Sequence, residues 1–224
     1  MPLPVRYKPV KAARLFTRTV SYDAINWNDW NEVSRRFQQQ LRWWYVTPIR
    51  HLRNRAPHSA FVQTALCCVL IDTLSQYDAG TNSSGSTFKS YVRSKLPHLC
   101  VPFPTPIRTW DEKRNRETSA KDFADVLWHG FRCGILHEAH MPLYGRIWGI
   151  PTVHQFVPAG FTTYADTGHD CPTIQLHPAK LVDEVEILFR EFFADLRNPG
   201  NVIFRQNFAS KFHSSYGIDI GNEP

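Results

Sequence analysis

The segment from Ser59 to Ala79 constrains the fold more than any other part of this 224-residue chain. It contains the string FVQTALCCVLIDTLSQY, which would be apolar on nearly every side of a helix. A helix that is apolar all round has to be surrounded by other elements, so we expect it at the centre of the core. Asp72 lies within this segment. A buried carboxylate requires a hydrogen-bonding or charged partner, so we expect one nearby.

Amphipathic helices predicted along the rest of the chain supply the layer around this segment. The clearest one has Pro178 in its first turn and is ended by the string NPG at 198–200. Its apolar residues recur at helical spacing: Leu181, Val182, Val185, Leu188, Phe189, Phe192 and Leu196. Further helices are predicted at 87–97 and at about 202–216.

A long helix is also predicted before the central segment. Asn28 or Asp29 can cap its start, and it runs to about Arg55 with a kink or break at Pro48. Its apolar stripe is expected to consist of Trp30, Val33, Phe37, Leu41 and Trp44.

The remaining segments predict an arm, a loop and a small β-rich insertion. Residues 1–27 contain three prolines and are expected to form an extended N-terminal arm ahead of a single domain at 28–224. Residues 98–118 combine prolines with the charged run DEKRNRE and predict a surface loop. Residues 143–177 are rich in aromatic and β-branched residues, which favours a small hairpin or lobe before the penultimate helix. The predicted fold class is mainly α, a helical bundle with this small β insertion.

Composition and cysteine usage indicate a cytoplasmic protein that does not contact a membrane. No stretch approaches the roughly 18 consecutive apolar residues of a membrane span. The basic N-terminus lacks the apolar run of a secretory signal. The five cysteines form no C-x-x-C pair, and an odd count argues against a disulfide framework.

Positive charge is concentrated in one segment of a chain whose net charge is +6. Residues 34–55 contain no acid and six arginines: Arg35, Arg36, Arg42, Arg50, Arg53 and Arg55. Arginine binds phosphate in a planar, bidentate manner, so such a run attracts polyanions. We predict Arg35, Arg36 and Arg42 as substrate contacts. The alternative is a solvated helix face with long apolar stems.

A helix that carries several titratable side chains is predicted from Ser119, with Asp122 in a capping-box-like position, to about Pro142. On an ideal α-helix, four of its side chains fall within about 140° of arc: His129, Arg132, His137 and His140. Phe123, Leu127 and Phe131 gather on the other side. We therefore expect one face to pack and the other to present cationic and titratable groups.

The string RCGILH, from Arg132 to His137, places an R-x4-H pair late in this helix. It resembles the signature of HEPN (higher eukaryotes and prokaryotes nucleotide-binding) ribonucleases, which is Arg, four to six residues, then His on a helix of an all-α bundle. The neighbouring elements are similar in order over roughly residues 60–197: an apolar helix with an internal acid, a polar loop, a short helix, and a later amphipathic helix. Many members have a polar residue directly after the Arg, where this chain has Cys133.

The resemblance implies a metal-independent endoribonuclease that needs no cofactor. Arg132 would stabilise the charge that develops on the phosphate, and His137 would move protons, because histidine titrates near neutral pH. The expected products carry a 2′,3′-cyclic phosphate and a 5′-hydroxyl. His129 and His140 are candidate phosphate contacts, and Glu138 is a candidate to orient a histidine.

Two roles stay open for Asp72, and the resemblance also bears on assembly. Asp72 either pairs with an arginine near the site or satisfies a buried hydrogen bond. HEPN ribonucleases often form homodimers whose helices face each other across one composite groove. The family further suggests a toxin or effector in prokaryotic defence, controlled by a regulatory protein partner or antitoxin.

Two other functions compete with this hypothesis. The first is a metal site drawn from His129, His137, Glu138, His140, His154, His169, Cys171 and His177. The H-E-x-H string at 137–140 has i, i+3 spacing, unlike the i, i+4 spacing of zinc helices. The second is a non-catalytic HEPN-like subunit that binds nucleic acid or protein within a larger complex.

Overall fold

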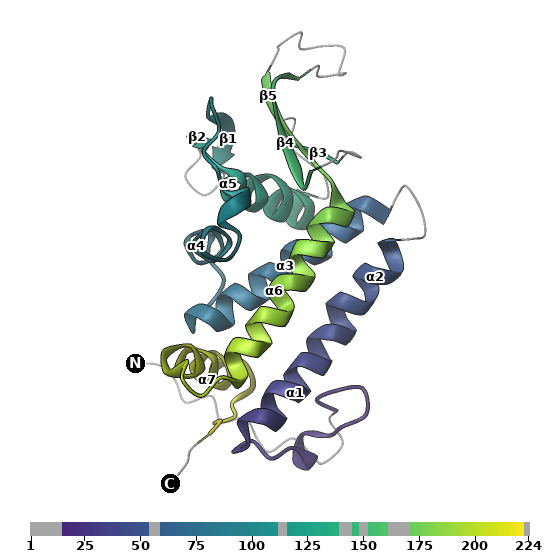
Figure 1. The fold of residues 1–224 in the computed structure, drawn as a ribbon, viewed down its shortest axis with the longest axis vertical. Helices are drawn as coiled ribbons and strands as arrows, with labels where there is room; N and C mark the ends of the chain where they lie inside the picture. The colour runs from purple at the N-terminus through teal and green to yellow at the C-terminus, as the bar shows by residue number, and fades with distance from the viewer. Residues whose placement is uncertain are drawn as a thin grey trace.

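Helix α3, Ala60–Ala79, is the central element of the fold, as predicted. It contacts α2 (Thr47–Arg53), α4 (Gly85–Lys95), α6 (Pro178–Arg197), α7 (Val202–Tyr216) and the π-helix η6 (Leu127–Glu138). Helix α6 crosses directly over it (Figure 1). This computed structural model describes residues 15–53, 59–111, 116–138, 145–147, 152–160 and 171–221. Among them the molecule is mainly helical with small β elements.

Helix α3 is long and apolar enough to cross a membrane by length and composition, with a mean hydropathy of 1.2. However, 56% of its apolar window is buried inside the protein. Cys67, Cys68, Leu70, Ile71 and Leu74 are fully buried in it. The helix therefore has the packing of a core helix.

The first long helix is continuous from Trp30 to Arg53, but it contains a π-helical turn. It consists of α1 (Trp30–Leu41), η2 (Arg42–Val46) and α2 (Thr47–Arg53), and the Asp29 side chain caps its start by accepting from the Asn31 N–H at 2.9 Å. Leu41 is buried, and the next buried residue is Val46, five positions on. A π-helix bonds i to i+5, so this turn shifts the buried stripe. Trp44 was expected in that stripe and is 54% exposed, so that prediction is wrong.

The other predicted helices are present. Helix α4, Gly85–Lys95, ends just before Pro97. Helix α6, Pro178–Arg197, buries every apolar residue that the periodicity assigned to its core face. Helix α7, Val202–Tyr216, packs on α3 and α6. Two short 3₁₀ turns, η1 (Tyr22–Ala24) and η4 (Pro97–Leu99), are also present.

Residues 98–118 were expected to form a surface loop, and they contain most of a β-hairpin instead. Strand β1, Ile107–Asp111, pairs antiparallel with β2, Arg116–Ala120. Ile107 and Ala120 face each other in the register and are buried, which fixes the hairpin to the core. Ser119 therefore lies in a strand, and the following helix α5, Phe123–Val126, is capped by the side chain of Asp122. The predicted helix start at Ser119 is wrong for this reason.

The β insertion before the penultimate helix is confirmed. Strands β3 (Gly145–Ile147), β4 (His154–Gly160) and β5 (Cys171–Leu176) form a sheet in the order β3-β5-β4. Strand β3 is parallel to β5, and β4 is antiparallel to it. Strand β5 leads directly into α6, so the sheet extends from the upper end of that helix (Figure 1).

Residues 15–29, most of which belong to the predicted N-terminal arm, pack onto the helical core. The Phe16 side chain is only 2% exposed. Its ring contacts Tyr22 and Trp27 within the same segment, and Phe212 and Tyr216 on α7. This aromatic cluster holds residues 15–29 against α7.

The β4 strand is docked on α5 by a histidine. The His154 ring stacks on the Phe123 ring with centroids 4.2 Å apart and planes inclined by 23°. Burial, and to a lesser degree nearby His98, lowers the pKa of His154 to about 4. The imidazole is therefore neutral in the folded protein at neutral pH.

Lowering the pH from 6.5 to about 4 should destabilise the protein through His154. In this window the unfolded chain binds a proton that the folded chain does not, so the free energy of unfolding rises with pH. Urea unfolding at several pH values measures this slope. His154→Phe keeps the stacked ring and should show a shallower slope; an unchanged slope would contradict the assignment.

A second prediction concerns the end of α3. Gly80 has φ +68, and a Cβ there would lie 3.0 Å from the Asn207 Cα. Gly80→Ala should lower the free energy of unfolding by about 1–3 kcal/mol, because it combines a left-handed backbone with a backbone clash. Gly200→Ala is the control, because its Cβ would meet only the side chain of Asn198. Equal midpoints in thermal unfolding for the two variants would refute the prediction.

Candidate functional site

The helix that carries the R-x4-H pair is π-helical. Helix α5 continues into η6, Leu127–Glu138, which has i to i+5 hydrogen bonding. The backbone of His137 follows that of Arg132 by five residues, so the two positions lie on about the same side of this helix. An α-helix would separate them by about 140°, so the arc calculated for α-helical geometry is wrong here. The side chains of His137 and Glu138, and the whole of His140, lie outside the described residues.

Arg132 is oriented by the carboxylate inside the central helix. Its Nη2 lies 3.0 Å from Asp72 Oδ2, and Asp72 is 6% exposed. The Ser83 hydroxyl, in the turn after α3, lies 2.7 and 2.9 Å from the two carboxylate oxygens and donates to them. Asp72 thus pairs with an arginine near the site, one of the two roles that the sequence left open.

A tryptophan that sequence reasoning missed holds the guanidinium from another side. The Arg132 Cζ lies 4.6 Å from the Trp128 ring centroid, within cation–π distance. The Trp128 ring packs on Phe88 of α4 at 5.1 Å. It also lies so close to Gly85 that a Cβ there would meet its Nε1 at 2.8 Å. The i, i+4 spacing of Trp128 and Arg132 was the available sequence signal.

Lys211 approaches the same carboxylate from α7, and no sequence pattern indicated this. Its side chain is buried, and its Nζ donates to Asn82 Oδ1 at 2.9 Å. Burial lowers the pKa of Lys211, and the Asp72 carboxylate acts against that shift. The environment of Asp72 therefore includes two basic side chains, Arg132 and Lys211.

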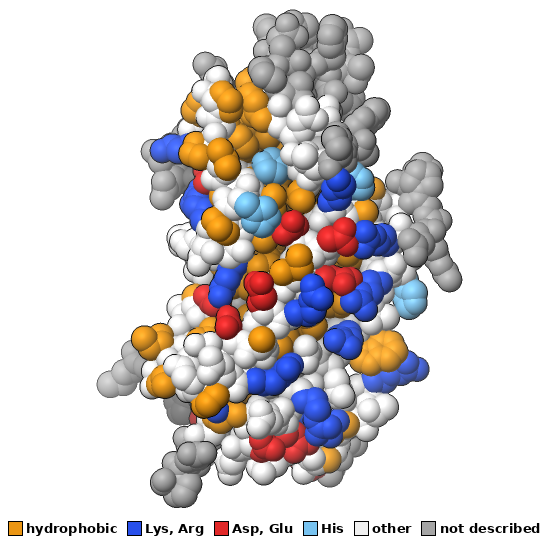
Figure 2. Space-filling view, in the orientation of Figure 1, with side chains coloured by type: hydrophobic (Ala, Val, Ile, Leu, Met, Phe, Trp, Pro, Cys, Tyr) orange, Lys and Arg blue, Asp and Glu red, His pale blue; other side chains and the backbone are white. Residues whose placement is uncertain are grey.

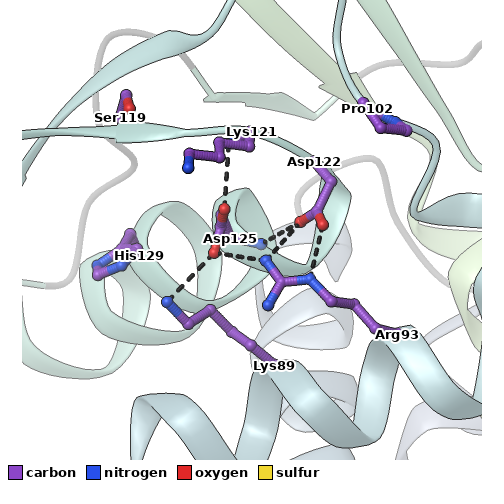
Figure 3. A pocket seen from close by; sticks show the side chains of 8 residues that line it. All are labelled: Lys89, Arg93, Pro102, Ser119, Lys121, Asp122, Asp125 and His129. Atoms are coloured by element: carbon purple, nitrogen blue, oxygen red, sulfur yellow. Dashed lines mark hydrogen bonds and ion pairs between the residues drawn. The ribbon is translucent and has the colours of Figure 1, made fainter.

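His129 lies on the same helix and lines a polar pocket of about 580 Å³. The pocket lies between α4, the end of β2 and the α5–η6 helix (Figure 3). Its lining consists of Lys89, Arg93, Pro102, Ser119, Lys121, Asp122, Asp125 and His129. Lys89, Arg93 and Lys121 outnumber its two carboxylates, which gives the pocket a cationic excess before any histidine is protonated.

An ion-pair network forms one wall of this pocket. The Arg93 guanidinium lies 2.6 Å from Asp122 and 2.9 Å from Asp125, and Lys89 Nζ lies 3.2 Å from Asp125 (Figure 3). Burial alone would raise the pKa of Asp125, but the backbone N–H of Lys121 and the Lys89 ammonium hold it below its ordinary value. These contacts favour the ionised form of Asp125, and the ion pairs to Arg93 hold both Asp122 and Asp125 in the pocket wall.

The predicted basic run is largely neutralised within the protein. Arg35 and Arg36 both pair with Glu32. Two more arginines pair with acids on α6: Arg50 with Glu186 at 2.6 Å, and Arg53 with Asp183. Figure 2 accordingly shows Lys and Arg side chains interleaved with Asp and Glu on this face. Within the described residues, Arg42 is exposed and has no ion pair, and Arg55 lies outside them.

The structure does not bring the three arginines predicted as substrate contacts to Arg132. Arg35 and Arg36 lie on α1 and Arg42 begins η2, and α1 lies across α6 from α4 and α5 (Figure 1). Arg35 and Arg36 are also both paired with Glu32, an acid that lies two residues before the 34–55 run. These arginines therefore do not belong to the site around Arg132 and His129.

The metal alternative finds no site in the described part of the chain. No group of three or more His, Cys, Asp or Glu side chains is placed there so that it could hold a metal ion. His154 and His177 are described, but His140 and His169 are not.

Comparison with known proteins adds no family assignment. No protein-family model matches the sequence, and neither a curated protein nor a solved structure matches it. The HEPN resemblance therefore depends on the residues of this chain alone.

Asp72→Asn should destabilise the protein by about 3 kcal/mol, because it leaves the Arg132 charge buried without its anion. Glu186→Gln removes a carboxylate from the more exposed pair with Arg50 and should cost less than about 1 kcal/mol. Urea unfolding of both variants checks the difference. Similar losses would mean that the Asp72–Arg132 pair does not contribute as a buried ion pair.

Proposed function

We propose that this protein is a metal-independent endoribonuclease of the HEPN kind, which cleaves RNA by attack of a ribose 2′-hydroxyl on the adjacent phosphate. One observation carries the proposal. The π-helical hydrogen bonding of η6 puts the positions of Arg132 and His137 on one side of the helix, and Asp72 orients the arginine. On an α-helix the same spacing would separate the two backbone positions by about 140°.

The proposed reaction needs proton transfer and charge stabilisation. His137, as a neutral imidazole, accepts the proton of the 2′-hydroxyl while the 2′-oxygen forms a bond to phosphorus. The bond from phosphorus to the 5′-oxygen then breaks, and that oxygen takes a proton from a second acid. Arg132 stabilises the extra negative charge on the phosphate in the transition state. The products are a 2′,3′-cyclic phosphate and a 5′-hydroxyl.

The pocket beside η6 supports a role in holding the RNA backbone. His129 precedes Arg132 by three residues, and it lines the pocket together with Lys89 and Lys121. In this pocket the two lysines would hold a phosphate next to the cleaved one. In this proposal His129 and the two lysines bind substrate, and Arg132 and His137 act on the scissile phosphate.

The proposal extends to assembly and cellular role. One helix supplies one Arg and one His, whereas a symmetric homodimer that pairs two η6 helices supplies two of each, including the second acid. We place such an enzyme in the cytoplasm, as a toxin or effector in prokaryotic defence. An active ribonuclease damages its own host, which favours control by a regulatory partner or antitoxin.

A second candidate function is a non-catalytic HEPN-like subunit that binds nucleic acid or protein. The observation that favours it is the packing of Arg132, whose side chain is only 17% exposed between Asp72 and Trp128. An ion pair in such a setting also stabilises a fold without any catalysis. Cleavage by the purified protein separates the two functions.

Cleavage of a single-stranded RNA in EDTA tests the proposal. His137→Ala should slow cleavage by about 10²–10⁴-fold, as expected for loss of an acid–base group. Arg132→Lys should slow it by about 10²-fold or more, because a lysine cannot reproduce the planar guanidinium. The products should carry a 2′,3′-cyclic phosphate, and an oligonucleotide with 2′-deoxyribose should not be cleaved.

The control is His213→Ala, which removes an exposed histidine on α7 and should leave the rate unchanged. Thermal unfolding of each variant separates loss of catalysis from loss of fold. Cleavage that is equally fast in folded His137→Ala and wild-type protein would refute the ribonuclease proposal. Complete absence of wild-type cleavage, as monomer and as dimer, would favour the non-catalytic subunit.

A further inference from the structure

Two adjacent tryptophans are exposed on the outer side of the first long helix. Trp43 is 47% exposed and Trp44 is 54% exposed, and both lie in the π-helical turn η2. An exposed indole leaves a large apolar face in water, so a pair of them marks a contact surface more strongly than scattered small residues do. The surface formed by Trp43, Trp44 and Arg42 is called the tryptophan platform below.

The π-turn is what puts both rings outside. The buried residues Leu41 and Val46 are five positions apart, and between them Arg42, Trp43 and Trp44 are exposed while Tyr45 packs against the core. Pro48 follows shortly after and has no N–H to donate, which interrupts the helical hydrogen bonding at this point. The exposure of the two tryptophans is therefore a property of the backbone rather than of a mobile side chain.

Two arginines, Arg18 and Arg42, accompany the tryptophans of the platform. The Arg18 Cζ lies 4.7 Å from the Trp43 ring centroid, so a guanidinium already lies over that indole. Arg42 is exposed and has no ion pair among the described residues. The sequence from Arg35 to Arg53 contains no acidic residue, and Glu32, at the start of the same helix, is paired with Arg35 and Arg36.

We propose that the tryptophan platform binds single-stranded nucleic acid, with bases stacked on Trp43 and Trp44 and phosphates held by Arg18 and Arg42. Indole rings stack on every base, and arginines next to them track the backbone. The exposed residues Gln39 and His51 on the same helix are polar. The helix therefore lacks the broad apolar face that a membrane-surface helix inserts into the lipid. Indole rings, arginines and polar neighbours together thus favour a polyanion with unpaired bases over a lipid surface.

This inference does not depend on cleavage at Arg132. It assigns a separate binding surface, on the α1–η2–α2 helix, and Figure 1 shows α1 and α2 across α6 from α4 and α5. If the chain also cleaves RNA, the platform would hold single-stranded segments of the substrate. An oligothymidylate has no 2′-hydroxyl, so its binding can be measured whether or not the ribonuclease proposal holds.

Fluorescence anisotropy with a labelled oligothymidylate of about 12 nucleotides, a length within known site sizes, tests the platform. Trp43→Ala and Trp44→Ala should each weaken binding at least about fivefold, as expected for loss of one stacked base. Arg42→Gln should weaken binding and reduce its dependence on salt. A duplex of the same length should bind more weakly than the single strand, because its bases are already stacked.

Ile203→Ala is the matched control, because it removes a 74% exposed apolar side chain on α7 and should leave binding unchanged. Thermal unfolding should show that all variants fold. Binding that is unaffected by both tryptophan substitutions would overturn the proposal. So would tryptophan-dependent binding to vesicles of phosphatidylcholine and phosphatidylserine without binding to the oligonucleotide, which would identify the surface as a membrane contact.

Discussion

The rest of the structure depends on the ion pair between Asp72 and Arg132. A carboxylate in the middle of an apolar central helix is costly to bury, and a single partner in the wrong place would not compensate for it. Here Arg132 of η6 and Ser83 of the turn after α3 both bond to it, so the pair fixes two elements against the core helix. The same contact that stabilises α3 therefore determines where the guanidinium of the candidate site lies.

The two π-helical segments have related effects at two different places. In η2 the extra residue per turn moves Trp43 and Trp44 to the outside of a helix whose stripe would otherwise bury one of them. In η6 it brings the positions of Arg132 and His137 to one side. Both candidate binding surfaces thus arise from departures from α-helical geometry, which occur frequently at functional sites.

Residues whose environment follows from periodicity could be predicted from the sequence. The buried face of α6 and the central place of α3 follow directly from the spacing and number of their apolar residues. Trp44 was misplaced because a 3.6-residue period was applied across a π-turn. The β1–β2 hairpin was missed because its strands are short and polar, so the charged run resembled a loop. The pairing of Asp72 with Arg132 spans 60 residues, and a single sequence shows that a partner is needed but not which one.

Gly85 shows how the first turn of α4 is mechanically linked to the candidate site. Gly85 has no side chain, and a Cβ at this position would lie 2.8 Å from the Trp128 Nε1. The Trp128 indole in turn lies against the Arg132 guanidinium. The start of α4 cannot move toward η6 without displacing the ring, and the ring cannot be displaced without disturbing the guanidinium. Any ligand or partner that repositions α4 would therefore act on Arg132 from a distance, through a contact between aromatic ring and backbone.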